Sequence, residues 1–546
     1  MSKGKTYTQI ILSVEGIQAY LFSTGKLKEM IGGSEATASF PDRTLSFCTE
    51  TLRLTKTEEP GEDDAWFVVL QNGAGALRLL LPNRGIAQEV LMDASAWVLE
   101  SCPGLPLYGA SVDCEWSENG FRDAYRKARQ AIALKRATQP LPTRVVYPFC
   151  RIAPLDGLPA IKKDREEYIS VESAGRRSQE LLTQSREKFH EVEKIIRNAG
   201  GLRQLLSPDV GLKWAEDMDE MVAGNKVKRI ALLHMDGNSL GKLFLDARDK
   251  VQNRNIPVRE QNRHMLGLSN LVDNANRHAF AEALMSIIRK DTQDRNADSV
   301  YVVPARPLVL GGDELTIIVR ADLAFLFADR YAAEFEKYTK EKYKRPLSVG
   351  GGMVVIPTGY PFTRAFKMVE ELTENAKRMT SLLEPRPSSL DYLVVTNDIE
   401  RDLESLRKKS YTACDGALLT GKPFICGRER QRNAGLNSLY DPKASLADIL
   451  CDTELLHSIL PSSQLRNAID ECREGVGAAK RAWKKLHENL LRGLGGGKEN
   501  AIASFERIFA HENFYLQDDE SNGPRVTLLG DYLELRRLFY PLEEDD

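Results

Sequence analysis

Apolar runs and helical periodicity alternate through the first 115 residues. Strand-like runs occupy residues 7–14, 66–70, 76–81 and 107–114. Helical patterns lie between them at residues 17–22, 27–31 and 85–100. The second and third runs flank the turn Asn72-Gly73-Ala74-Gly75, which indicates a β-hairpin. The order strand–helix–strand–strand–helix–strand predicts a ferredoxin-like fold.

The same order recurs later in the chain. Strand-like runs lie at residues 227–235, 300–310, 315–319 and 347–356, and helical patterns lie at 239–251, 260–290, 321–338 and 361–378. We interpret the two regions as a first and a second copy of one domain. The hairpin turn of the second copy is Gly311-Gly312-Asp313-Glu314, so it carries acids that the first copy lacks.

The remaining regions are mostly helical. Residues 116–225 are charged and contain a proline-rich break at 140–159, which indicates a helical linker. We therefore expect an α+β protein with two ferredoxin-like domains, a linker and a C-terminal helical domain. The expected domains are residues 1–115, 116–225, 226–384 and 385–546.

Composition and charge narrow the classes of protein. Hydrophobic residues make up 42% of the 546 residues and charged residues 28%, which excludes wholesale disorder. The formal net charge of -3 provides no global basic field that would attract nucleic acid or membrane. There is no apolar run of about 18 residues, and we expect a cytoplasmic protein without membrane contact. The eight cysteines contain no Cys-x-x-Cys pair and indicate neither a disulfide framework nor a zinc ribbon.

Carboxylates are predicted to converge in the second copy. Asp236 follows a buried strand, and the ferredoxin-like order places the hairpin turn with Asp313 and Glu314 beside that strand. Carboxylates held this close repel each other unless they share a divalent cation. Their hard oxygen ligands suit Mg²⁺ or Mn²⁺. We therefore expect Asp236, Asp313 and Glu314 to bind two metal ions and to carry the catalysis.

This layout is typical of a palm-type nucleotidyl-transfer site of the GGDEF/polymerase-like kind, in which two metal ions activate a ribose hydroxyl and hold a triphosphate. Turn amides after the strand, small turn glycines and a lysine on the last helix are expected to contact the nucleotide. These residues are Gly237, Asn238, Ser239, Leu240, Gly311, Gly312 and Lys377.

Each feature also has a structural interpretation. Gly-Gly-Asp-Glu is a common composition for an ordinary β-turn. Lys377 alone is more often a solvated helix charge, and His234 is more often a strand residue than a ligand. The joint position of Asp236 and the acidic turn favours function.

The first copy has no acid in its hairpin turn and is predicted to be inactive. We expect the two copies to face each other and form one composite nucleotide site. Two glycine-rich segments, interpreted as loops, could lie against a base or phosphate. They are Gly32-Gly33-Ser34, with Gly33 and Ser34 as nucleotide contacts, and Gly350-Gly351-Gly352. Tight packing between the copies is an equally good explanation of either segment.

Several motifs, taken in order, resemble the CRISPR polymerase family, the large signalling subunit of type III CRISPR effectors. The matching residues are 17–22, 26–28, 31–34, 236–241, 311–314, 347–352, 376–377, 460–466 and 531–535. The resemblance covers most of the chain. Diguanylate cyclases share the palm and the acidic turn, but they lack the duplication and the helical tail.

The resemblance implies that ATP is the substrate and that cyclic oligoadenylate second messengers are the product, in antiviral defence. RNA and other type III effector subunits are the implied partners. Two departures from the family stand out. There is no His-Asp doublet of the family's nuclease domain, so DNA cleavage is not expected. Only Cys150 remains of the cysteine cluster between the palms, which leaves zinc binding doubtful.

Other functions remain open at this point. The chain could be a non-catalytic scaffold that binds RNA or nucleotide and retains the palm for its shape. Template-dependent polymerisation would need a basic duplex-binding groove, which the charge balance does not indicate. Retention of both Asp236 and Asp313 favours catalysis, because buried carboxylates are costly to keep together.

Overall fold

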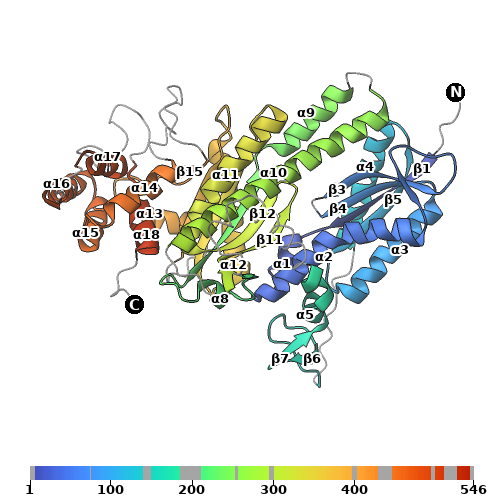
Figure 1. Cartoon of the computed structure of the whole chain (residues 1–546), viewed down its shortest axis with the longest axis horizontal. Coiled ribbons are helices and arrows are strands. Elements are labelled where there is room, and N and C mark those ends of the chain that lie inside the picture. The colour runs from blue at the N-terminus through green and yellow to red at the C-terminus, as the bar shows by residue number, and fades with distance from the viewer. Residues whose placement is uncertain are drawn as a thin grey trace.

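The computed structural model describes residues 6–73, 75–138, 149–184, 211–252, 256–293, 300–395, 403–427, 445–493, 498–509 and 526–540. In these residues two β-sheets, each packed against helices, lie side by side. The C-terminal helices form one end of the molecule (Figure 1). This α+β architecture confirms the predicted fold class.

The first copy has a five-stranded sheet of order β2-β3-β4-β1-β5. Its strands are β1 (Thr6–Val14), β2 (Thr55–Thr57), β3 (Trp66–Gly73), β4 (Ala76–Leu81) and β5 (Leu107–Glu115). The core order β3-β4-β1-β5, with every neighbour antiparallel, is the ferredoxin-like arrangement.

Helices cover both faces of this first sheet. Alternate strand residues such as Ile10 and Leu12 pack with α2 (Leu27–Ser46) and α3 (Arg84–Ser101). Ile11, of opposite parity, packs against α4 (Glu118–Thr138). The expected linker therefore begins with a helix that covers the first sheet.

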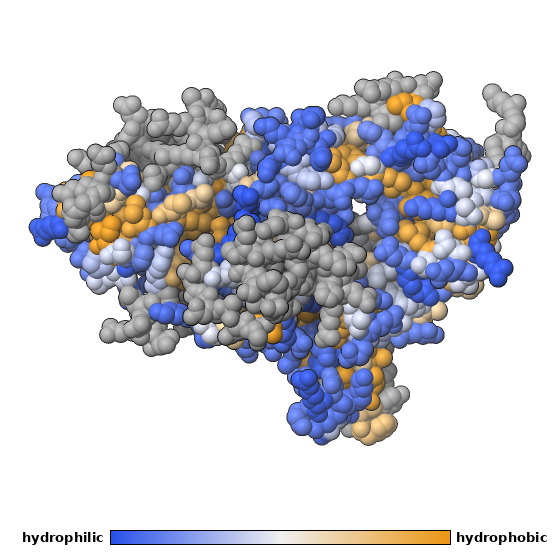
Figure 2. All heavy atoms as spheres, in the orientation of Figure 1, coloured by the Kyte–Doolittle hydropathy of each residue, from blue (hydrophilic) through white to orange (hydrophobic). Residues whose placement is uncertain are grey.

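Residues 160–176 of the linker form a small projection. It contains β6 (Ala160–Asp164), β7 (Glu167–Ser170) and α5 (Val171–Arg176), where the sequence indicated helices. Figure 2 shows hydrophilic and hydrophobic side chains together on this projection at the bottom of the view. Most of the helix expected over residues 178–198 lies outside the described residues.

The second copy has a six-stranded sheet of order β11-β12-β9-β13-β14-β15. Its strands are β9 (Arg229–Gly237), β11 (Ala305–Gly311), β12 (Glu314–Arg320), β13 (Val349–Pro357), β14 (Ser389–Val394) and β15 (Phe424–Ile425). Strand β14 pairs with β13 in parallel. The sheet therefore continues past residue 384, where the sequence indicated helices.

The long strand expected over residues 300–310 is divided. The segment β10 (Val300–Val303) precedes Pro304 and pairs with β8 (Gly211–Trp214) in a separate sheet, near α8 (Met218–Val222). Proline has no N–H group to donate to a ladder, which explains the break.

Helices also cover both faces of the second sheet. Leu233, Met353 and their neighbours of the same parity pack with α10 (Val258–Gln293) and α11 (Ala321–Tyr343), and α9 (Leu240–Gln252) joins this layer. The opposite face packs on α12 (Phe362–Thr380). That hydrophobic cluster also contains α2 and α3, so the two copies share one core.

Helix α1 (Ile17–Leu21) lies at this junction. The Phe22 ring that follows it stacks on Phe366 of α12, with 4.3 Å between centroids. Thr363 Oγ1 donates to the carbonyl oxygen of Phe22 over 2.8 Å. These contacts bring the start of the first copy close to the last helix of the second.

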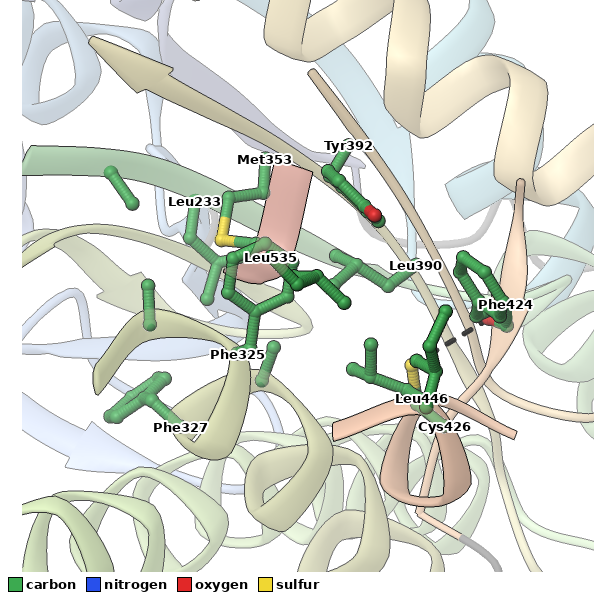
Figure 3. Packing of buried hydrophobic residues seen from close by; sticks show 14 of the residues in the cluster. Leu233, Phe325, Phe327, Met353, Leu390, Tyr392, Phe424, Cys426, Leu446 and Leu535 are labelled. Atoms are coloured by element: carbon green, nitrogen blue, oxygen red, sulfur yellow. Dashed lines mark hydrogen bonds between the residues drawn. The ribbon is translucent and has the colours of Figure 1, made fainter. Parts of the chain in front are cut away.

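The C-terminal part is mostly helical in the described residues. Its helices are α13 (Leu403–Tyr411), α14 (Leu446–Leu456), α15 (Ser462–Arg473), α16 (Val476–Gly493), α17 (Lys498–Phe509) and α18 (Leu529–Phe539). The sequence indicated one helix over 462–489, but the chain breaks at Gly475, whose φ is 112°. Figure 3 shows Leu535 of α18 beside Leu233, Met353 and Phe325, and Leu446 of α14 beside Cys426, all in one hydrophobic cluster.

No helix in the described part of the chain is long and apolar enough to cross a membrane.

Candidate functional site

The predicted acids meet where β9 and β12 pair. Asp236, near the end of β9, lies opposite Glu314, the first residue of β12. Gly311 pairs with Glu314, so Gly312 and Asp313 form a two-residue turn. Gly312 has a φ of 58°, which a residue with a side chain adopts at a cost. Glycine at this position lets the hairpin present Asp313 beside Asp236.

Lys377 of α12 also lies at this point. Its Nζ forms an ion pair with Asp236 Oδ2 and donates to the carbonyl oxygen of Gly237 over 3.2 Å. Gly350 of β13 pairs with Asp236 from the other side. A Cβ added to Gly350 would lie 2.5 Å from Lys377 Cγ, so this glycine makes room for the lysine to cross the strand.

The site carries an excess of negative charge. Burial, followed by the charge of Asp236, raises the pKa of Asp313 to about 6. Burial and the charges of Asp236 and Asp313 raise the pKa of Glu314 to about 7, although a hydrogen bond from Gln18 opposes the shift. Such carboxylates bind a cation readily, because a cation relieves their mutual repulsion.

The donor set fits a magnesium-type site completed by a substrate. Among the described residues no three His, Cys, Asp or Glu side chains are grouped as a metal cage. Mg²⁺ usually takes one or two carboxylates together with substrate phosphates and water. Asp236 and Asp313, whose carboxylates lie close enough for the charge of one to influence the ionisation of the other, match that pattern. Glu314 differs, because it receives the hydrogen bond from Gln18.

His234 lies in β9 beneath these acids. It is buried, and its Nδ1 lies 2.9 Å from Thr316 Oγ1. Burial lowers the pKa of His234 to about 4, although the charge of Asp236 opposes this shift. The imidazole is therefore neutral near pH 7 and packs as a strand residue.

The turn after β9 is only partly available for phosphate. The Asn238 amide donates to the carbonyl oxygen of Ser348 over 2.8 Å, so it is already engaged. Phosphate binding by this amide would require that bond to open, and phosphate contact at this turn stays a prediction. Ser239 is exposed with a φ of 57°, and α9 begins at Leu240. A Cβ added to Gly311 would meet no atom within 4 Å, so the space beside that turn residue is open.

Helix α10 holds the acidic turn in place. Asp273 Oδ1 accepts from the Gly312 amide over 3.0 Å. Asn276 Nδ2 donates to the carbonyl oxygens of Gly312 and Glu314 over 3.2 and 2.9 Å, while its Oδ1 accepts from Tyr331 at 3.0 Å. The sequence pattern alone did not single out Asp273 and Asn276. Their signal is a polar pair three residues apart on an otherwise apolar helix face.

The first copy contributes contacts to this site but no acid from its hairpin turn. Gln18 of α1 reaches Glu314. Glu15, which follows β1, accepts from Arg129 over 2.9 Å and from Arg136 over 3.1 Å. Glu15 is thus engaged by α4 as a structural charge.

The two glycine-rich segments expected to be loops are not loops. Gly33 and Ser34 lie within α2, and Gly350-Gly351-Gly352 lies within β13. In each segment another part of the chain approaches closely. A Cβ on Gly32 would lie 1.7 Å from the Arg176 carbonyl oxygen, and one on Gly352 would lie 2.3 Å from that of Val369.

Ser34 joins the two copies. Its Oγ donates to the carbonyl oxygen of Leu308 in β11. Gly33 faces Leu21 and Tyr20, which lie within 3.1 and 3.2 Å of the position a Cβ would take. The close-packing explanation therefore accounts for these residues without a nucleotide.

The region around the site is similar to a known protein family. Residues 229–381 match the family model described as Cas10/Cmr2, second palm domain. No curated protein matches the chain.

Solved structures of Csm1 are similar to the chain. Csm1 in T. onnurineus is 15% identical with a TM-score of 0.45, over 97% of this chain and 70% of that chain. A Csm1–Csm4 cassette in complex with cA4 is 14% identical with a TM-score of 0.40, over 83% of this chain and 63% of that one. A cassette in complex with cA3 is 16% identical with a TM-score of 0.42, over 75% and 57%. This chain spans between 57% and 63% of the length of Csm1 in four such cassette structures.

The segment that matches the family model runs from β9 through α12. It therefore includes Asp236, the acidic turn Asp313-Glu314 and Lys377. These residues meet in the structure at one end of the second sheet. Residues 229–381 of this chain are therefore similar to the second palm domain of the Cas10/Cmr2 family.

Proposed function

We propose that this chain is a metal-dependent nucleotidyltransferase that converts ATP into cyclic oligoadenylate-type second messengers. The observation that carries the proposal is the meeting of Asp236, Asp313 and Glu314 at the paired ends of β9 and β12, with Lys377 beside them. The family of the second palm supports a nucleotide substrate. Similar Csm1–Csm4 cassettes have been solved in complex with ATP, cA3 and cA4.

The chain's own residues would act as follows. Asp236 and Asp313 hold Mg²⁺ or Mn²⁺, with Glu314 beside them at the strand pair. When bound, these ions supply positive charge for the triphosphate and the attacking hydroxyl. The open space beside Gly311 admits the nucleotide, and Lys377 neutralises Asp236 until phosphate and metal arrive.

The cellular setting belongs to the same proposal. We place the chain in the cytoplasm, in CRISPR or related antiviral defence, with RNA and other type III effector subunits as partners. The first copy serves as the second wall of the site, and Gln18 is its observed contact with the acids.

The function is tested by incubating the full chain with ATP and Mg²⁺ or Mn²⁺ and identifying the products by mass spectrometry. We expect cyclic or linear oligoadenylates from the wild type and none from Asp313→Ala. The Asp313→Ala change should alter the free energy of unfolding by no more than about 1 kcal/mol, because a carboxylate repelled by its neighbours contributes little to folding.

Asp246→Ala is the matched control, since Asp246 is an exposed acid on the nearby helix α9. Its products should equal those of the wild type. Full activity in folded Asp313→Ala would contradict the two-metal assignment.

A non-catalytic scaffold that binds RNA or nucleotide is the second candidate. It is favoured by the ion pair between Lys377 and Asp236, which neutralises part of the site without a metal. A wild-type chain that binds ATP but yields no product with either metal, alone or with RNA, would support this alternative.

A further inference from the structure

An arginine beyond the matched segment lies beside the site. Arg386 is in the connection between α12 and β14, within Pro385-Arg386-Pro387. A residue that precedes proline is largely confined to extended conformations, so the flanking prolines restrict the backbone at Arg386. Its side chain therefore projects from a connection with few alternative conformations.

Arg386 is directed to the turn after β9. Its Nη1 donates to Ser239 Oγ over 2.9 Å. Its Nη2 donates to the carbonyl oxygen of Lys377, and its Nε donates to Thr380 Oγ1 over 3.3 Å. One guanidinium thus joins the loop that follows Asp236 to the end of the helix that carries Lys377.

All of these partners are neutral. No carboxylate in the described part of the chain forms an ion pair with Arg386, and burial alone lowers its pKa. A half-buried cation without an anion is costly, and an incoming anion would remove that cost. By contrast, Lys377 is already paired with Asp236.

The position also suits phosphate. Ser239 is exposed and immediately precedes α9, a helix of 13 residues. A guanidinium presents a planar fork of donors that matches phosphate oxygens in a bidentate manner. The hydroxyl of Ser239 and the amides of the first helical turn would lie beside the same phosphate.

We propose that Arg386 binds the polyphosphate of the nucleoside triphosphate, exchanging its bond to Ser239 for phosphate oxygens. The inference rests on the proposed function and adds a residue to its binding site. Arg386 and Lys377 then have different tasks. Arg386 holds the phosphate chain, and Lys377 balances the charge of Asp236.

The test is calorimetric binding of AMPPNP and of adenosine to the full chain, comparing the wild type with Arg386→Gln and Arg386→Lys. We expect Arg386→Gln to weaken AMPPNP binding by about tenfold or more, which is about 1.4 kcal/mol. Adenosine affinity should remain within about twofold, because adenosine carries no phosphate. Arg386→Lys should fall between, since lysine keeps the charge but loses the fork.

Arg378→Gln is the control, because Arg378 is an exposed arginine at the end of the same helix and bonds to Asn375. It should bind AMPPNP as the wild type does. Unchanged AMPPNP affinity in Arg386→Gln would overturn the proposal. Equal losses for AMPPNP and adenosine would also overturn it, since they indicate a structural role. A wild-type chain that binds no AMPPNP would refute the proposed function itself.

Discussion

At the scale of single residues, Asp313 and Glu314 stand out because the pKa values of their carboxyl groups are raised. Their pKa values are raised to about 6 and about 7 from ordinary values of 3.8 and 4.5. The folded protein therefore binds more protons than the unfolded chain between about pH 4 and pH 7. Stability that is present below the ordinary pKa values is lost as pH rises through the raised ones.

We accordingly predict that metal-free protein loses thermal stability from these two groups between about pH 4 and pH 7. The measurement is the Tm in EDTA across that range, for the wild type and for Asp313→Asn combined with Glu314→Gln. The double variant removes both titrations, so its Tm should fall less with rising pH. Saturating Mg²⁺ with a triphosphate should reduce the same loss in the wild type.

His234 contributes with the opposite sign. Its pKa is lowered from 6.5 to about 4, so the stability it provides is lost as pH falls. His234 Nδ1 lies 3.8 Å from Glu314 Oε1, so the comparison also includes Asp313→Asn alone, which leaves that contact in place. Parallel pH profiles for the wild type and the double variant would contradict the assignment of raised pKa values.

At the scale of elements, β13 and α10 shape the site although neither carries one of the three predicted acids. Gly350 of β13 leaves space for Lys377 to reach Asp236. Asp273 and Asn276 of α10 fix the backbone of the acidic turn. Each contact connects segments that are far apart in the chain.

Gly350→Ala tests the space in β13. The new Cβ would lie 2.5 Å from Lys377 Cγ, so the lysine must move away from Asp236. We expect the rate of ATP turnover to fall by about tenfold or more, because misplaced charged groups are costly in catalysis. The control is Gly359→Ala, whose Cβ would meet no atom within 4 Å. Equal turnover in the two variants would show that Lys377 has room to adjust.

Asn276→Ala tests the support of the turn. The change removes two donated hydrogen bonds and leaves the Tyr331 hydroxyl without its acceptor. We expect a loss of about 1–3 kcal/mol in the free energy of unfolding, measured by urea denaturation, together with lower kcat. The exposed neighbour Asn274→Ala should change neither quantity. Normal kcat in a destabilised Asn276→Ala would restrict this residue to a folding role.

At the scale of the whole molecule, the C-terminal helices are fixed to the second sheet by a buried charge cluster. The side chain of Lys422 is only 1% exposed, and its Nζ lies 2.6 Å from Glu534 Oε2 and 3.6 Å from Asp531 Oδ1 on α18. The same Nζ lies over the ring of Tyr392 in β14, 3.9 Å from the centroid. The cluster therefore connects the end of the chain to the second sheet.

Lys422→Met should destabilise this junction. Loss of the cation leaves the buried carboxylate of Asp531 and the partly buried carboxylate of Glu534 without their counter-charge. Removing one partner of a buried ion pair typically costs about 3–5 kcal/mol. We expect a lower midpoint of chemical unfolding, or a separate early transition of the C-terminal helices. Lys408→Met, at an exposed lysine of α13, provides the control. Identical unfolding curves for both variants would mean that the cluster contributes no net stability.

The sequence predicted the duplicated strand and helix order well, because local periodicity directly reflects which face of each element is buried. It also predicted that Asp236 would meet the Gly311–Glu314 turn, since the fold's strand order fixes which ends are neighbours. Strand β14 was missed because only its parallel pairing with β13 identifies it as part of the sheet.

The glycine-rich segments show the limit of local reasoning most clearly. Runs of glycine indicate loops when read alone, yet Gly32 and Gly350 lie in a helix and a strand. Glycine is needed at these two positions because Arg176 and Lys377 approach them closely from elsewhere in the chain. The sequence by itself determined the duplicated architecture and the acids at its strand ends. The tertiary structure alone decided which residues surround those acids, because such contacts depend on packing between segments distant in sequence.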